Sequence, residues 1–247
     1  MKWGVRRWQY SDGSLTPEGY IRYARSNLKG AKVSNLDKWG TDNRHNVCYI
    51  VGHSGSGKST TAIALAKQGD KVIHLDGYSD PSSLGTASLR NHDFDEFLNK
   101  ELPNWRLMTN AKDSGTKVLR FSKEYWSIVD GFRDAIEKYG AKQFRNGNRV
   151  IVEGVQLADD WFVEDKKYFQ DKPVIALGTN AFKSTFRASL RDGISLRELE
   201  EIKTLLMRQK RWNAQMNQIV RAIGANKISD SDILELVSTG KEYLEGQ

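Results

Sequence analysis

The chain has 247 residues, of which 38% are hydrophobic and 28% are charged, and its formal net charge is +7. This length suits one α/β domain with appendages, and the composition is typical of a globular protein. No apolar run approaches the roughly 18 residues that a membrane helix needs, and no apolar stretch follows the first charged residues, so we expect neither a membrane span nor a secretory signal. Cys48 is the only cysteine, which excludes an internal disulfide and favours a reducing, cytoplasmic location.

The positive charge is concentrated near the N-terminus. Residues 1–38 contain eight Lys or Arg and three Asp or Glu. Turn signals at 11–14 and 16–19 interrupt this part, although Thr16 can cap a short helix that starts at Pro17. We therefore expect residues 1–44 to form a loosely ordered, basic and aromatic arm, residues 45–227 to form the main domain, and residues 228–247 to form a helical tail.

Regular α/β patterning begins with an apolar run at residues 47–51, which is typical of a strand buried on both faces. A glycine-rich loop follows, then a predicted helix at 60–68 and a second strand at 71–75. A strand, a helix and a strand within about thirty residues form a βαβ unit, which predicts a parallel sheet.

The later elements repeat this alternation. Apolar runs predict two more buried strands, at 149–153 and 173–177. Helical patterns are predicted at 93–102 before Pro103, at 122–139 before Gly140, at 181–191, in a long helix opened by the pair Ser195 and Glu198, and at 230–237. The expected fold is α/β, with a doubly wound parallel sheet.

The segment Gly52–Ser59 reads G-H-S-G-S-G-K-S and fits the phosphate-loop (Walker A) pattern G-x-x-x-x-G-K-[ST] at every fixed position. Its glycines let successive backbone N–H groups face a phosphate, and the helix that follows adds its positive end. Lys58 supplies a charge for the β- and γ-phosphates, and Ser59 supplies a hydroxyl for Mg²⁺. The predicted nucleotide-binding residues are Gly52, Ser54, Gly55, Ser56, Gly57, Lys58, Ser59 and Thr60. The loop predicts the fold of P-loop nucleoside triphosphate hydrolases, and the residues that follow the other strands favour its nucleoside/nucleotide kinase-like form.

Two acids follow predicted strands. Asp76 comes directly after the second strand, where a carboxylate can accept the proton of an attacking hydroxyl. Glu153 ends the third strand, where an acid can hold Mg²⁺ through water or contact the acceptor. An Asp-Glu pair, which hydrolytic motors usually carry there, is missing from Val152-Glu153-Gly154, and this favours transfer to an acceptor. We interpret His53 as a loop side chain without a catalytic role.

A basic helix face follows the fourth strand. Lys183, Arg187 and Arg191 recur every four residues and so share one face of the helix. We interpret this face as a lid whose arginines neutralise the transferring phosphoryl group.

Four segments, Gly52–Ser59, Asp76-Gly77-Tyr78, Ile151–Gly154 and Phe186–Asp192, together resemble the uridine kinase/phosphoribulokinase group of P-loop kinases. The resemblance covers roughly residues 46–193. It implies that Asp76 is the base, that Glu153 contacts the metal or the acceptor, and that Arg187 and Arg191 are lid arginines. Ala188 departs from the pattern, because the family often has a second arginine there. Zeta-toxin-like and polynucleotide-kinase-like enzymes share this layout and remain open.

The expected function is transfer of the γ-phosphoryl group of ATP (or GTP), with Mg²⁺, to a nucleoside, nucleotide, sugar or sugar nucleotide. A toxin kinase acting on a cell-wall sugar nucleotide belongs to this class. The irregular residues 79–122 would form the acceptor wall, with Tyr78, Arg90, Trp105 and Arg120 as candidate contacts.

The alternative is a nucleic-acid-associated P-loop NTPase or polynucleotide kinase of phage origin. Residues 3–8 and 12–17 are similar to short leader segments of proteins encoded by phages and prophages. The alternation of Trp and Arg in this arm also suits single-stranded nucleic acid or a protein partner.

Overall fold

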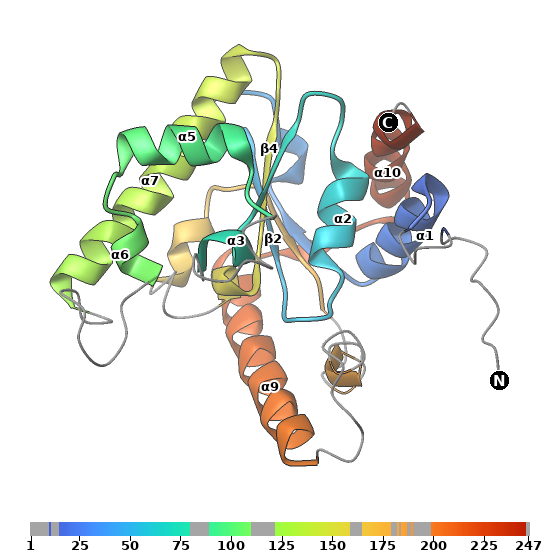
Figure 1. Cartoon of the computed structure of the whole chain (residues 1–247). Helices are drawn as coiled ribbons and strands as arrows, with labels where there is room; N and C mark the ends of the chain where they lie inside the picture. Colours follow the sequence, from blue (N-terminus) through green and yellow to red (C-terminus); the bar gives the residue numbers. More distant parts are fainter. Residues whose placement is uncertain are drawn as a thin grey trace.

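The computed structural model describes residues 10, 15–79, 89–109, 122–158, 165–178, 182, 184–186, 189 and 199–245. Over these residues the chain is an α/β protein whose strands form one sheet in the order β3-β4-β2-β5-β1-β6, with helices on both faces (Figure 1). None of the described helices is both long enough and apolar enough to cross a membrane.

Four neighbouring strands of the sheet are parallel. They are β3 (Lys71–His74), β4 (Val150–Glu153), β2 (Val47–Val51) and β5 (Val174–Ala176). The prediction of a parallel sheet is confirmed for this part, but the complete sheet is mixed. Its other edge consists of β1 (Lys32–Ser34), antiparallel to β5, and β6 (Asn226–Lys227), antiparallel to β1. These two strands are too short and too polar to produce a strand pattern in the sequence.

Alternate residues of the buried strands pack into different layers. Val47, Tyr49 and Val51 face a core made with α5 (His92–Glu101), α6 (Arg106–Thr109), α7 (Lys123–Arg145) and α9 (Leu199–Ala222). Cys48 and Ile50 face a second core made with α1 (Pro17–Leu28), α2 (Lys58–Leu65) and α10 (Asp230–Glu245). The sheet is therefore covered on both sides, as its continuous apolar runs require.

The expectation of a loosely ordered arm is wrong for residues 15–44. Thr16 caps α1 by accepting a hydrogen bond of 3.1 Å from the N–H of Gly19, and Pro17 is the first helical residue. Ile21 and Leu28 are buried against α2 and α10. Residues 1–9 and 11–14 lie outside the described part. The C-terminal segment is helical as predicted, but α10 packs on α1 and α2 within the same layer.

Gly140 does not end α7, contrary to the prediction, and the helix continues to Arg145. A Cβ atom at position 140 would lie 2.3 Å from Cγ2 of Val47, so this glycine lets α7 approach the central strand closely. The remaining helical turns are short: α3 (Asp76–Ser79), η1 (Leu36–Lys38), η2 (Val155–Ala158) and η3 (Lys166–Phe169).

Candidate functional site

The glycine-rich loop connects the carboxyl end of β2 to the start of α2. Gly55 and Gly57 have φ values of 75° and 90°, in the left-handed region that only glycine adopts without strain. Gly57 is the N-cap of α2 and provides no side-chain cap. The first N–H groups of a helix have no acceptor within the helix, so this end of α2 is suited to an anion.

Lys58 adds a positive charge to the loop. Its Nζ donates a hydrogen bond of 3.1 Å to the carbonyl of His53, and the residue is only 6% exposed. The side chain of His53 is itself buried. Burial of Lys58 keeps its charge close to any anion that the loop holds, because screening by water is reduced there.

Glu153, at the end of β4, contacts the loop and the neighbouring strand. Its Oε1 accepts a hydrogen bond of 2.9 Å from Oγ of Ser59 and lies 2.6 Å from Nδ1 of His74. Burial of Glu153 raises the pKa of its carboxyl, but the hydrogen bonds from His74 and Ser59 and the charges of Lys58 and His74 outweigh burial, so the pKa lies below its ordinary value. The carboxyl is therefore ionised at neutral pH.

Asp76 is the first residue of α3 and comes shortly after the end of β3. Nε2 of Gln156, in η2, donates a hydrogen bond of 2.7 Å to Oδ1 of Asp76. This contact joins the segments that follow β3 and β4, and it holds one oxygen of the carboxylate in place. The second oxygen of a carboxylate oriented in this way can accept a proton from a bound group.

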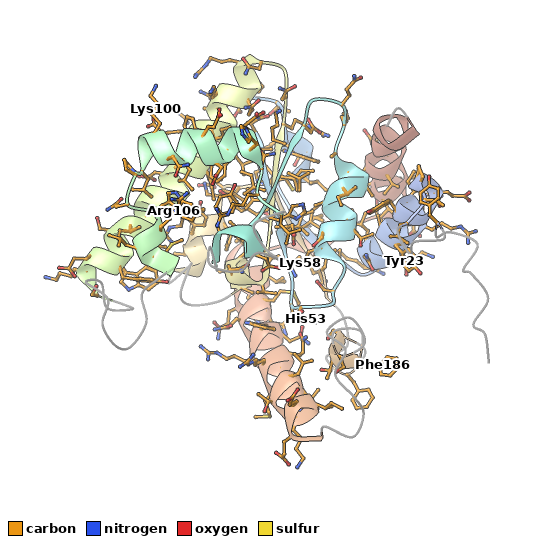
Figure 2. All side chains as sticks on the ribbon, viewed as in Figure 1. Tyr23, His53, Lys58, Lys100, Arg106 and Phe186 are labelled. Atoms are coloured by element: carbon orange, nitrogen blue, oxygen red, sulfur yellow. The ribbon has the colours of Figure 1, made fainter. Side chains whose placement is uncertain are left out.

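A cavity of about 450 Å³ lies at the loop. Its walls come from the loop and the start of α2, from Tyr23 and Asn27 of α1, and from Asp76 and Val155. Figure 2 shows Lys58 beside the start of α2 and Tyr23 on the adjacent helix α1. The structure thus brings Lys58 and Asp76 to one cavity.

The remaining predicted residues have different positions. Ser54, Gly55, Gly57, Ser59 and Thr60 line the cavity. Gly52 and Ser56 belong to the loop, but they are not among the lining residues. Arg120 and the residues that were predicted to form a lid, Lys183, Arg187 and Arg191, lie outside the described residues.

Tyr78 and Trp105 do not fit the expected role of acceptor contacts. They are 1% and 0% exposed and pack with Phe94 and Phe132 in the core. Arg90 covers both rings, with its guanidinium carbon 6.0 Å from the centre of Tyr78 and 5.5 Å from that of Trp105. Its Nε also donates a hydrogen bond of 2.8 Å to the carbonyl of Gly77. The two aromatic residues therefore support Arg90 and the segment after Asp76.

No sequence pattern had indicated Tyr23, Asn27, His74 or Gln156 as site residues. His74 and Gln156 could have been predicted as site residues, because each lies within three residues of a predicted strand end. Tyr23 and Asn27 lie in a segment that was expected to be an arm, and no motif links them to the loop.

The site offers oxygen ligands to a cation. Over the described residues, no group of three or more His, Cys, Asp or Glu side chains is arranged to hold a metal ion. Mg²⁺ bound with a nucleotide needs fewer protein ligands, because phosphate oxygens and water complete its coordination. The hydroxyl of Ser59 and the ionised carboxylate of Glu153 fit that requirement.

No model of a known protein family matches the sequence, and a comparison with curated proteins yields no match either.

Proposed function

We propose that the chain is an ATP-dependent kinase with the P-loop fold, which transfers the γ-phosphoryl group to a hydroxyl of a small acceptor. The observation that carries the proposal is that Lys58, within a complete phosphate-loop motif, and Asp76, after the next strand, line the same cavity. The first supplies a charge for phosphate, and the second supplies a base for a hydroxyl.

The sheet order supports this proposal. β2, which leads into the loop, lies between β4 and β5 in the parallel part of the sheet. In open α/β sheets, ligands bind beyond the carboxyl ends of the strands, near the place where the order of strands reverses. The loop occupies such a position, with Asp76 and Glu153 at the ends of the strands on one side.

In the proposed reaction, the acceptor hydroxyl oxygen forms a bond to the γ-phosphorus while the bond from that phosphorus to the β–γ bridging oxygen breaks. ADP leaves with this electron pair, and Asp76 takes the hydroxyl proton. Gln156 orients Asp76 through its hydrogen bond of 2.7 Å. Lys58 and the first N–H groups of α2 bind the β- and γ-phosphates and stabilise the charge that develops there.

Ser59 and Glu153 would hold Mg²⁺, which would supply a positive charge to neutralise the phosphate groups. The lowered pKa of Glu153 supports this role, because only the ionised carboxylate attracts a cation. His74, at 2.6 Å from Oε1, positions the carboxylate.

The test is a screen with γ-labelled ATP and Mg²⁺ against nucleosides, nucleotides, sugars, sugar nucleotides and oligonucleotides with a 5′-hydroxyl. We expect one acceptor class to become labelled and ADP formation to depend on that acceptor. ATP hydrolysis that needs DNA or RNA, without any labelled acceptor, would instead favour a nucleic-acid-associated NTPase.

A further inference from the structure

The cavity at the phosphate loop has two chemically different ends. Asp76 and Val155 follow β3 and β4, and they line the cavity on the side of α2 where Figure 1 shows α3, opposite to α1. Tyr23 and Asn27 line the other end and come from α1, which precedes the parallel strands in the sequence. Figure 2 shows Tyr23 on α1, on the side of α2 away from α3.

Asn27 ties α1 to the start of α2. Its Nδ2 donates hydrogen bonds of 3.3 Å to the carbonyl of Gly57 and 3.4 Å to Oγ1 of Thr61. The approach is close, because a Cβ atom on Gly57 would lie 2.1 Å from this nitrogen. Tyr23 lies four residues before Asn27 and so shares its face of the helix. The contacts of Asn27 therefore hold this part of α1, including the backbone at Tyr23, against the start of α2.

The chemistry of transfer gives the bound triphosphate a direction. The γ-phosphate must lie at the Asp76 end, because Asp76 accepts the proton of the hydroxyl that attacks it. Lys58 and the loop hold the phosphates between the two ends. The α-phosphate and the nucleoside then extend toward Thr60 and α1, where the cavity is bounded by an aromatic ring.

We propose that α1 forms the nucleoside subsite of this enzyme and that the ring of Tyr23 stacks on the bound nucleoside. The proposal rests on the proposed kinase function, which fixes the direction of the triphosphate. Stacking on an aromatic ring is available to every base, so Tyr23 contributes affinity without selecting one base. We therefore expect ATP and GTP to bind with similar affinity.

The experiment measures binding of MgADP, MgGDP and inorganic tripolyphosphate by titration calorimetry. The proteins are the wild type, Tyr23→Ala, Tyr23→Phe and the control Tyr10→Ala, which removes a tyrosine that is 53% exposed and does not line the cavity. We expect Tyr23→Ala to weaken both nucleotides by roughly ten-fold or more and to leave tripolyphosphate binding unchanged. Tyr23→Phe and Tyr10→Ala should bind like the wild type.

Unchanged tripolyphosphate binding shows in the same experiment that the Tyr23→Ala protein is folded and that its loop is intact. Nucleotide affinity unaffected by Tyr23→Ala overturns the subsite. An equal loss of nucleotide and tripolyphosphate binding in that variant also overturns it, since Tyr23 would then act through the loop. A wild-type protein that binds none of the three ligands overturns the proposed function itself.

Discussion

The hydroxyl of Ser59 donates a hydrogen bond of 2.9 Å to the carboxylate of Glu153, although 94 positions separate the two residues in the sequence. Parallel pairing of β2 with β4 brings them together. The two strands end on the same side of the sheet, so the loop that follows β2 starts close to Glu153, the last residue of β4. His74 reaches the same oxygen from the adjacent strand β3, where it pairs with Glu153 in register. The order of the strands in the sheet therefore brings the side chains of Ser59, His74 and Glu153 together.

The lowered pKa of Glu153 predicts a stability that depends on pH. A carboxyl whose pKa is lower in the folded state than in the unfolded state stabilises the protein above the unfolded pKa of about 4.5. This contribution is lost as the pH falls through the folded pKa. We expect Glu153→Gln to lower the free energy of unfolding by on the order of 1 kcal/mol at neutral pH, and the difference from wild type to disappear in acid. Urea unfolding over a pH series measures both effects.

The control for that series is Glu201→Gln, which changes an exposed glutamate on α9. Its free energy of unfolding should equal that of the wild type at every pH. A constant difference between Glu153→Gln and wild type from neutral pH to acid would contradict the assigned ionisation.

The two residues that carry the proposed function should separate binding from transfer. Lys58→Ala should lose nucleotide binding and transfer together, because the loop then lacks its cation. Asp76→Asn should bind MgATP normally and lose roughly 10²- to 10⁴-fold in transfer rate, because an amide cannot accept the hydroxyl proton. Calorimetry and labelled-product assays measure the two properties. The control Asp134→Asn, at an exposed position on α7, should leave both unchanged, and normal transfer by Asp76→Asn would remove the assigned base.

Two glycines of α7 should respond to alanine in opposite ways. At Gly140 the added Cβ would meet Val47 at 2.3 Å, so Gly140→Ala should destabilise the protein by about 1–3 kcal/mol through overpacking. At Gly131 the nearest atom is the end of the Leu102 side chain at 3.0 Å, which can move. Gly131→Ala should therefore be neutral, or stabilising by up to about 1 kcal/mol through helix propensity. Thermal and urea unfolding measure the difference, and equal effects at both sites would contradict the close approach of α7 to β2.

Cys48 should be inert in the folded protein. It is fully buried in the central strand, and burial raises the pKa of its thiol to about 12, so almost no thiolate forms at about pH 8. Iodoacetamide should label it only after unfolding in urea, and the midpoint of labelling should match that of circular dichroism. Rapid labelling without denaturant would contradict the burial of β2.

Local patterns in the sequence determined much of this fold. Continuous apolar runs marked three of the four parallel strands, β2, β4 and β5, because a strand covered on both faces must be apolar along most of its length. The loop motif marked the phosphate-binding candidate, because its glycine spacing is itself the structural requirement. The predicted ends of the helices were less accurate. Gly140 was predicted to end a helix, because the sequence does not distinguish a glycine that permits close packing from a glycine that ends a helix.

Only the tertiary structure decided which distant segments complete the candidate site. Residues 15–44 had no sustained pattern, yet Thr16 caps a helix whose buried face packs on α2, and Asn27 contacts the loop. Long-range pairing also determined that His74 and Ser59 meet at Glu153, and that Tyr78 and Trp105 are buried beneath Arg90. The physical reason is that the periodicity of apolar residues indicates which secondary structure a segment forms and which of its faces is apolar. The partner of each face depends on sheet order and helix packing, which involve the whole chain at once.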